Sequence, residues 1–221
     1  MKEVSISLLS VMYKIDSSRF FLDFESANTD YFHIDVMDGK FVEKDTAAKM
    51  KELANTAVMV TNVGLDVHLM VENIRDFIEE YVSFRPKIIS FHKEAVKSDN
   101  EMMELIDIIK ESGSMVGIAI NPETNIEEIY PYLKFIHVAL IMSVHPGKGG
   151  QEFINDTFDK IIKLKKYIED NNLDTLIEVD GGIGDKNCEK VSNSGADILV
   201  SGSYPTLSND YRAAIRRLKN C

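Results

Sequence analysis

Residues 65–120 carry the pattern that decides the fold, and they read LDVHLMVENIRDFIEEYVSFRPKIISFHKEAVKSDNEMMELIDIIKESGSMVGIAI. Short apolar runs alternate here with longer segments whose apolar residues recur at helical spacing. Asn100–Ser112 is one such helical segment, and Gly113 follows it as a stop signal. The apolar runs are Leu65–Met70, Ile88–His92 and Met115–Ile120. Because these runs are mostly apolar rather than alternating, we expect parallel strands that are covered on both faces.

The same alternation continues to both ends of the chain, where Asn155–Asn171 is another helical segment. The remaining strand candidates are Val4–Leu9, Tyr31–Val36, Val138–Val144, Leu176–Val179 and Ile198–Val200. About eight strand and helix units without a linker favour a closed barrel over an open doubly wound sheet, which normally has fewer strands. We therefore predict an α/β fold, a single (β/α)8 TIM barrel domain spanning residues 1–221.

Composition narrows the class of partner. The formal net charge is −11, which argues against nucleic acid or an anionic membrane surface and favours a small-molecule ligand. No window approaches the roughly 20 apolar residues of a membrane span, and the start, MKEVSISLLSVMYKID, is too short an apolar run for a signal peptide. Cys188 and Cys221 lack the paired spacing of a zinc or redox motif, so we expect a reducing, cytoplasmic location.

Polar side chains stand at the ends of several predicted strands, where barrel enzymes carry their chemistry. His33 and Asp35 are two residues apart and therefore share one side of their strand, while His68, His92 and Asp180 end three others. Two imidazoles and two carboxylates that converge would bind a divalent ion such as Zn²⁺, Fe²⁺, Mn²⁺ or Co²⁺. Each histidine taken alone could instead be a hydrogen-bonded core residue. The four groups together favour a metal site formed by His33, Asp35, His68 and Asp180.

The chain resembles the ribulose-phosphate 3-epimerase family through an ordered set of motifs that runs along almost its whole length. These motifs are SISLLS, HIDVMDGKFV, LDVHLMVE, FHKE, GIAINPET, IMSVHPGKGGQEFI, IEVDGGI and VSGS. The resemblance implies that His33, Asp35, His68 and Asp180 bind the metal and that Asp35 and Asp180 also act as acid and base. Inverting a carbon beside a ketone requires removal of a proton on one face and its return on the other. The divalent cation would stabilise the intervening ene-diolate as a Lewis acid.

Other residues are expected to line the substrate pocket, where His68 and Asp180 would also contact the sugar. Ser7 matches a substrate-contacting serine of the family, although its hydroxyl could instead cap the following turn. Met37, Met70 and Met142 could surround the intermediate or serve only as core packing. We expect glycine-rich loops after the last three strands to bind phosphate through backbone N–H groups. The residues concerned are Gly147, Gly149, Gly150, Gly181, Gly182, Gly202 and Ser203.

Some loops depart from the family pattern. Lys148 and His145 lie in the glycine-rich segment 144–151, which we expect to act as a lid, and Lys148 could contact phosphate or stay solvated. Glu43 and Lys44 replace the usual Pro-Asn pair, and SYPTLS after Gly202 is also unusual. These changes border loops that could set the length of the substrate, so the identity of the substrate is not fixed by the motifs. None of them alters a proposed metal ligand.

We therefore predict 3-epimerisation of D-ribulose 5-phosphate to D-xylulose 5-phosphate by an isomerase with one divalent ion, Zn²⁺ or Fe²⁺ above Mn²⁺ or Co²⁺. An alternative substrate is D-allulose 6-phosphate. A Schiff-base aldolase using Lys93 and a non-catalytic sugar-phosphate binding module are other classes of function. We also expect a homo-oligomer, following the resemblance.

Overall fold

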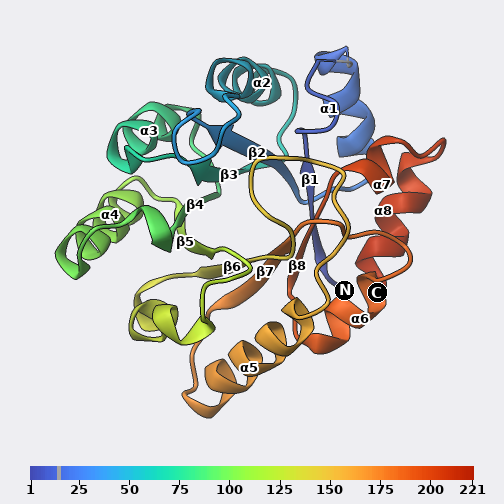
Figure 1. Ribbon diagram of the computed structural model, residues 1–221. Helices are drawn as coiled ribbons and strands as arrows, with labels where there is room; N and C mark the ends of the chain where they lie inside the picture. The colour runs from blue at the N-terminus through green and yellow to red at the C-terminus, as the bar shows by residue number, and fades with distance from the viewer. Residues whose placement is uncertain (14–15) are drawn as a thin grey trace.

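The computed structural model describes residues 1–13 and 16–221, so Lys14 and Ile15 of the N-terminal stretch considered above lie outside the described residues. Within the described part, eight parallel strands form one closed barrel in sequence order, with β8 pairing back to β1 (Figure 1). The predicted (β/α)8 barrel is therefore confirmed. The strands are β1 (Glu3–Ser7), β2 (Tyr31–Met37), β3 (Gly64–Met70), β4 (Ile88–His92), β5 (Met115–Ile120), β6 (Val138–Met142), β7 (Leu176–Asp180) and β8 (Ile198–Ser201).

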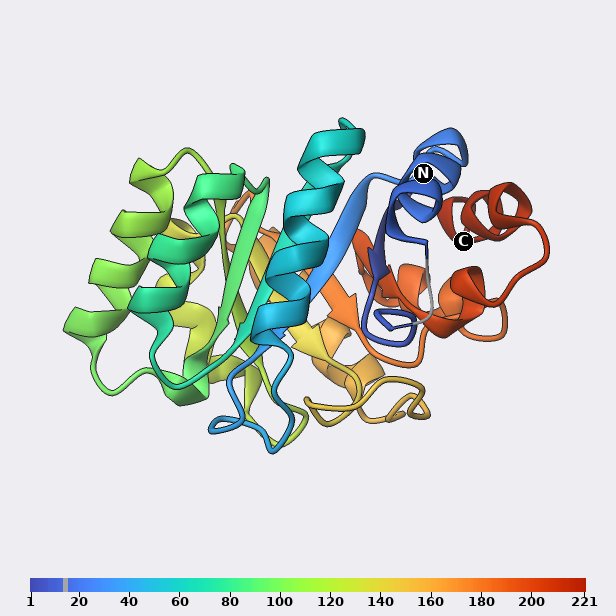
Figure 2. The ribbon, with the colours of Figure 1, turned by 90° about the horizontal axis from the view of Figure 1, so that it is seen from above.

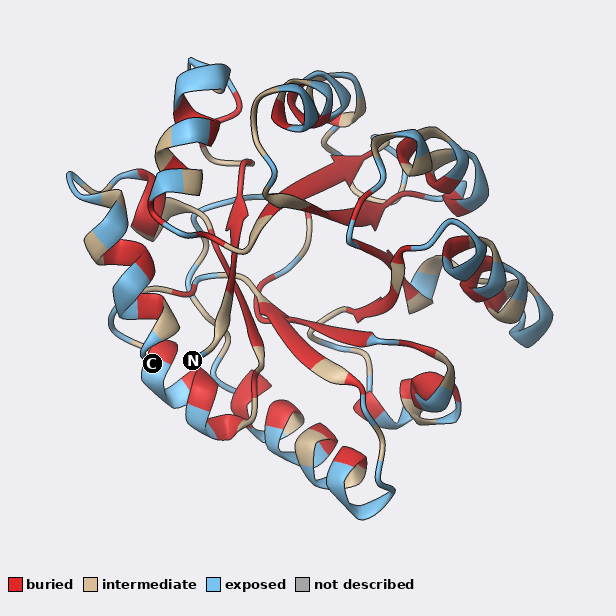
Figure 3. Cartoon of the chain, turned by 180° about the vertical axis from the view of Figure 1, so that it is seen from behind, coloured by how far each residue is buried: buried red, intermediate tan, exposed pale blue. Residues whose placement is uncertain are grey.

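Helices surround the barrel and turn their buried sides toward it, as the burial colouring shows (Figure 3). The α-helices are α1 (Ser17–Ser26), α2 (Ala47–Val60), α3 (Ile74–Tyr81), α4 (Asp99–Glu111), α5 (Thr157–Asp170), α6 (Cys188–Ser194), α7 (Ser203–Thr206) and α8 (Tyr211–Lys219). Short 3₁₀ helices are η1 (Val82–Phe84), η2 (Lys93–Ala95) and η3 (Ile126–Phe135).

The crossover from β5 to β6 differs from the others because it is a 3₁₀ helix rather than an α-helix. Pro131 lies inside η3, and proline has no backbone N–H for the hydrogen bond that an α-helix needs there. By contrast, α4 begins where Ser98 accepts a hydrogen bond from the Glu101 N–H, an N-cap that agrees with the helix predicted from sequence.

The strands match the predicted runs within two residues at each end, and β4 and β5 match at both ends. Continuous burial along the strands explains why their sequences are apolar on both faces. Side chains of Ile88, Val138 and Ile198 form a small separate apolar cluster that Tyr31, Met115 and Leu176 flank. All of these residues lie at or near the first residues of their strands, so the polar side chains considered below occupy the opposite, carboxyl ends.

Loops at the carboxyl ends of the strands gather at one end of the barrel. Figure 2 shows the loop after β2 and the long loop after β6 extending from the same end of the molecule. Asp38 links two of these loops, because its carboxylate accepts hydrogen bonds from the N–H groups of Lys40, Phe41 and Glu72. This end of the barrel is therefore the one at which a site can form.

Cys188 and Cys221 form a disulfide, with Cα atoms 5.7 Å apart. Their separation of 33 residues carries no recognisable sequence signature, and the pairing arises because α8 returns the chain end to the start of α6. Disulfides are rare in reducing compartments, so this pairing does not support the reducing location inferred from the two cysteines. Among the described residues, no helix combines the length and apolarity needed to cross a membrane.

Candidate active site

Four predicted ligands meet at the carboxyl end of the barrel. His33 and Asp35 extend from β2, His68 from β3 and Asp180 from β7, and one potential ligand atom of each lies within 4.8 Å of the others. His33 Nε2 lies 3.5 Å from Asp35 Oδ1 and 3.7 Å from Asp180 Oδ2. His68 Nδ1 lies 3.8 Å and 3.7 Å from the same two oxygens. Period-two alternation along each strand aims these side chains into one space.

The arrangement fits a divalent metal ion. Two ligand atoms that are each about 2.1 Å from one ion lie roughly 3 to 3.5 Å apart, close to the separations observed here. His33 Nε2 and His68 Nδ1 are fully buried and have no hydrogen-bond partner among the described residues. Buried nitrogens of this kind are costly unless a partner satisfies them, and an ion between two imidazoles and two carboxylates would do so. The cluster can therefore hold a metal ion.

The orientation of His33 is fixed from behind by Asp66. Asp66 Oδ2 lies 2.5 Å from His33 Nδ1 and accepts a second hydrogen bond of 2.7 Å from Ser5 Oγ. All three side chains are inaccessible to solvent. A carboxylate accepts only, so Nδ1 of His33 carries a proton, and Nε2 is the nitrogen that can offer a lone pair to a metal ion in the cluster.

Asp35 is supported by two hydroxyl groups. Ser7 Oγ donates a hydrogen bond of 2.7 Å to Asp35 Oδ2, leaving Oδ1 toward the histidines. Thr46 Oγ1 donates to the Asp35 carbonyl oxygen at 2.6 Å and accepts from the Met37 N–H at 3.0 Å. These bonds hold the end of β2 in place and restrict the Asp35 carboxylate to one orientation.

The two aspartates differ in proton affinity. Burial raises the pKa of Asp180 to about 7, and the nearby charges of Asp35 and Asp66 add to this effect. Burial acts the same way on Asp35, but the nearby imidazoles of His33 and His68 outweigh it and hold the Asp35 pKa well below its ordinary value. One carboxyl is therefore protonated much more readily than the other.

The histidines also differ in the direction of their pKa shifts. Burial disfavours the charged form of His33, yet the carboxylates of Asp66 and Asp35 raise its pKa well above the ordinary value. Burial lowers the pKa of His68, and it lowers that of His92 to about 4. A divalent ion in the cluster would favour neutral imidazoles, because a metal and a proton compete for the same nitrogen.

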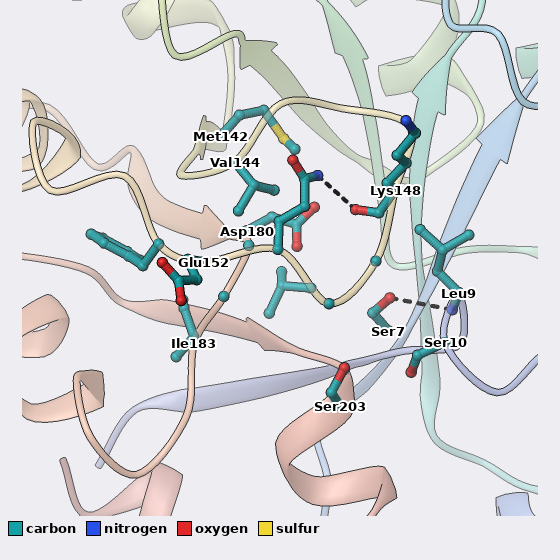
Figure 4. A pocket seen from close by; sticks show the side chains of 18 of the residues that line it. Ser7, Leu9, Ser10, Met142, Val144, Lys148, Glu152, Asp180, Ile183 and Ser203 are labelled. Atoms are coloured by element: carbon teal, nitrogen blue, oxygen red, sulfur yellow. Dashed lines mark hydrogen bonds between the residues drawn. The ribbon is translucent and has the colours of Figure 1, made fainter.

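A cavity of about 470 Å³ opens above the cluster. Its lining includes the following residues expected to contact substrate: Ser7, Met37, Met70, Met142, Gly147, Gly149, Gly150, Asp180, Gly181, Gly182, Gly202 and Ser203. His68 is not part of the wall, because it is fully buried beneath it. Figure 4 shows the hydroxyl side chains of Ser7, Ser10 and Ser203 gathered on one side of the cavity.

Two adjacent glycines bring the loops after β6 and β7 close together. Gly181 and Gly182 have positive φ angles of 124° and 64°. A Cβ on Gly182 would lie 2.7 Å from the Phe153 N atom and 2.9 Å from the Gln151 carbonyl oxygen. Ser143 Oγ braces the same turn, because its single proton is shared between the Asp180 and Gly181 carbonyl oxygens at 2.9 and 2.7 Å. Glycine is needed at residue 182 for both its backbone angle and this close approach.

The predicted lid has internal hydrogen bonds. The Gln151 side-chain amide donates to the carbonyl oxygens of His145 and Lys148, each at 2.7 Å. Figure 4 marks the bond to Lys148 with a dashed line. His145 Nδ1 lies 3.1 Å from Glu123 Oε1, and both side chains are mostly exposed. Lys148 belongs to the cavity lining, although the residue is exposed. Both residues that depart from the family pattern therefore line the cavity, and His145 in addition pairs with Glu123.

Several residues of this region were missed by sequence reasoning. Asp66 and Glu178 lie two residues before His68 and Asp180, so the period-two alternation that placed the ligands also points these carboxyls into the barrel. Both are fully buried, and burial raises the pKa of Glu178 well above its ordinary value. Ser143 and Thr46 act on backbone groups across loops, which no local pattern reveals.

Fold and cluster together define a barrel protein whose mouth combines two imidazoles and two carboxylates able to hold a metal ion. A sequence profile of the ribulose-phosphate 3-epimerase family matches residues 3–205. The ribulose-phosphate 3-epimerase of Helicobacter pylori strain J99 is 41% identical over 194 residues, which cover 88% of this chain and 87% of that protein. The Bacillus subtilis protein of the same name is 35% identical over 198 residues, covering 89% of each chain. The chain belongs to the ribulose-phosphate 3-epimerase family and is an isomerase.

Solved structures with low sequence identity share the fold. KGPDC from Streptococcus mutans superposes with a TM-score of 0.70 at 11% identity, covering 100% of this chain and 96% of that one. The 3-hexulose-6-phosphate synthase from Salmonella typhimurium gives a TM-score of 0.66 at 15% identity, covering 100% and 97%. At these identities the likeness shows the barrel fold alone.

Proposed function

We propose that this protein interconverts D-ribulose 5-phosphate and D-xylulose 5-phosphate by inverting carbon three. The observation that carries the proposal is the convergence of Asp35 and Asp180, from the non-adjacent strands β2 and β7, at the floor of the cavity. Relatives that cover most of the chain bear the name ribulose-phosphate 3-epimerase, and this favours the pentose over a hexulose phosphate.

The two carboxyls provide the proton transfers. In one direction, ionised Asp35 takes the proton from carbon three, and the C–H electron pair moves to form the ene-diolate with carbon two. Protonated Asp180 then returns a proton to the opposite face, and the carbonyl group forms again. The proton positions on the two aspartates are now exchanged, so the protein is ready for the reverse reaction until they exchange with water. Ser7 holds the Asp35 carboxylate during these steps through its 2.7 Å hydrogen bond.

The cavity walls position the sugar phosphate. Gly181, Gly182, Gly202 and Ser203 line the cavity. Their backbone N–H groups would bind the phosphate and offset the repulsion expected from a net charge of −11. Met37, Met70 and Met142 provide apolar surface that excludes water from the reacting carbon. The segment 144–151 closes over this space as a lid.

His33, Asp35, His68 and Asp180 would hold one divalent ion, and we propose Zn²⁺ or Fe²⁺ ahead of Mn²⁺ or Co²⁺. When bound, the ion supplies Lewis-acid stabilisation of the negative charge that develops on the substrate oxygens. The buried nitrogens His33 Nε2 and His68 Nδ1, which lack a hydrogen-bond partner among the described residues, support this assignment.

Comparison of two substrates tests the proposal. Metal-reconstituted protein is assayed on D-ribulose 5-phosphate and D-allulose 6-phosphate under identical conditions. The proposal expects a higher kcat/KM for the pentose, and chelation of the metal should abolish turnover of both. A higher kcat/KM for the hexose would overturn the substrate assignment and direct attention to Glu43 and Lys148, which border the cavity loops.

Two other classes of function have less support. A Schiff-base aldolase would need Lys93 in the cavity, but Lys93 lies outside the cavity lining and its Nζ lies 3.9 Å from Glu128 Oε2. Borohydride trapping with substrate tests this directly, and an adduct at Lys93 would support the aldolase. A binding module would bind sugar phosphate without exchanging its carbon-bound proton in heavy water.

We further propose that residues 1–221 form one catalytic domain that assembles into a homo-oligomer. Leu22 on α1 and Val58 and Met59 on α2 are exposed apolar side chains on neighbouring helices, which supports an interface there. Light scattering after size exclusion tests the assembly, and a monomeric mass at micromolar concentration would exclude it. The cytoplasmic location stays a prediction.

A further inference from the structure

His92 ends β4 and is fully buried, yet it is not part of the proposed ligand cluster. Its ring lies between two others. The His68 ring meets it edge to edge, with centroids 5.0 Å apart and ring planes 22° apart, and the Phe41 ring centroid lies 4.8 Å away. A buried imidazole that contacts a proposed ligand in this way has a defined hydrogen-bond role, because both of its nitrogens need partners.

The contact between His68 and His92 restricts where the protons lie. His68 Nε2 and His92 Nε2 are 2.9 Å apart, so one of these nitrogens must donate and the other must accept. His68 Nδ1 points toward Asp35 and Asp180 and has no hydrogen-bond partner within residues 1–13 and 16–221. If Nδ1 is to act as a metal ligand, the His68 proton must sit on Nε2. His92 Nε2 is then the acceptor, and the single proton of His92 lies on Nδ1.

Glu94 completes this chain. His92 Nδ1 lies 3.1 Å from Glu94 Oε2, which can only accept when the carboxyl is ionised. The other oxygen, Glu94 Oε1, accepts from the Asn121 N–H at 2.7 Å and from the Thr124 hydroxyl. Both oxygens of Glu94 are therefore acceptors. His68 Nε2 donates to His92 Nε2, and His92 Nδ1 donates to Glu94, so each contact has one donor and one acceptor.

The loop that contacts Glu94, at the end of this series of hydrogen bonds, is itself held in place. Lys160 Nζ of α5 donates to the carbonyl oxygens of Asn121, Pro122 and Thr124 at 2.7 to 3.1 Å. The loop that binds Glu94 is thus fixed to the outer layer of the barrel. Glu94 also has a restricted position, with only 23% of its side chain exposed.

We propose that His92 and Glu94 are positioning residues that set the tautomer of His68, so that its Nδ1 lone pair faces the ligand cluster. The tautomer of His33 is set by direct contact with one carboxylate, Asp66. The tautomer of His68 is set through His92, because Glu94 lies on η2, beyond the end of β4. This inference rests on the proposed metal site for its purpose, but the tautomers themselves can be measured without metal.

The first experiment measures the tautomers directly. Protein labelled with ¹⁵N-histidine is studied free of metal by long-range ¹H–¹⁵N correlation NMR, which distinguishes protonated from unprotonated ring nitrogens. The chain contains five histidines, so assignment by single substitutions is practical. We expect the proton of His68 on Nε2 and that of His92 on Nδ1. A proton on Nδ1 of His68 in this spectrum would overturn the proposal.

Glu94→Gln tests the role of the carboxylate. If the new amide oxygen serves Asn121 and Thr124, its NH₂ group faces His92 Nδ1 and reverses both histidine tautomers, which places a proton on His68 Nδ1. If the amide is turned the other way, its NH₂ group opposes the Asn121 N–H. Removal of such outer partners weakens metal binding by about 10-fold to 100-fold. We expect that loss in a chelator competition assay, together with the altered ¹⁵N pattern of His68.

His92→Phe keeps a ring between His68 and Phe41 but removes the acceptor, and should cause a similar loss of metal affinity. Glu127→Gln on η3 is the matched control, because this exposed side chain lies outside the chain of hydrogen bonds, and it should leave affinity and spectrum unchanged. Wild-type metal affinity and tautomers in Glu94→Gln would overturn the proposal. Failure of the wild-type protein to bind metal or epimerise would instead refute the proposed function, since the metal-free spectrum reports on the tautomers alone.

Discussion

Asp66 Oδ2 and His33 Nδ1 are 2.5 Å apart in a part of the barrel that solvent does not reach. This contact determines that Nε2 is the His33 atom available to a metal, and it joins the candidate metal site to Ser5 on β1. The carboxylates of the proposed site therefore have two roles: Asp66 orients an imidazole, whereas Asp35 and Asp180 face the cavity.

Asp66→Asn should weaken metal binding because an amide is a poorer acceptor than a carboxylate for the His33 N–H. Partners of this kind contribute about 10-fold to 100-fold to metal affinity. Chelator competition on the purified protein measures the change. Asp159→Asn on the exposed side of α5 is the control and should bind metal like the wild type. Unchanged affinity in Asp66→Asn would show that His33 keeps its orientation without the charge.

Ser7→Ala should lower kcat more than it changes stability. The substitution removes the 2.7 Å hydrogen bond to Asp35 Oδ2, which leaves the carboxylate free to rotate. Hydrogen bonds to charged groups contribute about 1.5 to 3 kcal/mol, which corresponds to a kcat lower by roughly 10-fold to 100-fold. Steady-state kinetics with D-ribulose 5-phosphate measure this. A rise in KM with unchanged kcat would mean that Ser7 binds substrate and does not orient Asp35.

Gly182→Ala should raise KM for the sugar phosphate, because the new methyl group would displace the backbone of Gln151 and Phe153 in the cavity wall. Gly113→Ala provides a matched control. Gly113 also has a positive φ, of 84°, but a Cβ there meets no atom of the described residues within 4 Å. Left-handed backbone strain should lower the free energy of unfolding of both variants by about 1 kcal/mol, and only Gly182→Ala should alter KM. Equal KM values in the two variants would contradict a binding role for this turn.

Glu94 should contribute to stability in a pH-dependent way. Burial opposes its ionisation, but hydrogen bonds from His92, Thr124 and the Asn121 N–H prevail and lower the pKa of Glu94 to about 2, from 4.5. A carboxyl with a depressed folded-state pKa stabilises the fold fully above its unfolded pKa, and this contribution disappears as the pH falls through the folded pKa. Denaturant unfolding of metal-free wild type and Glu94→Gln should therefore differ most above pH 5, with the gap shrinking from pH 4.5 toward 2. A gap that is independent of pH would refute this account.

The barrel could be predicted from sequence because its strands are covered on both faces, which makes each run apolar and easy to count. The crossover η3 was less visible, since Pro131 changes the helix type while Ile126, Ile129 and Leu133 still pack inward. The disulfide between Cys188 and Cys221 depends on how α8 packs against the barrel, and no local pattern contains that information.

The cluster of His33, Asp35, His68 and Asp180 was also predictable, because strand alternation and the common carboxyl end of a barrel bring such residues together. Asp66 and Glu178 follow the same alternation but stand earlier in strands that were treated as apolar. Glu94 could not be placed, because its contact with His92 depends on the turn of η2 after the strand. Residues that act across loops need the structure.

The central claim, that Asp35 and Asp180 act on opposite faces of one carbon, is tested most directly by proton exchange in heavy water. Metal-reconstituted Asp35→Asn and Asp180→Asn, matched for metal content, are each incubated with either epimer, and deuterium at carbon three is followed by NMR. Loss of one proton-transfer group should reduce epimerisation by about 100-fold to 10,000-fold. Each variant should then exchange the proton of only one epimer, and the two variants should select different epimers. Epimerisation at the wild-type rate by either variant, or exchange of the same epimer by both, would contradict the two-aspartate account.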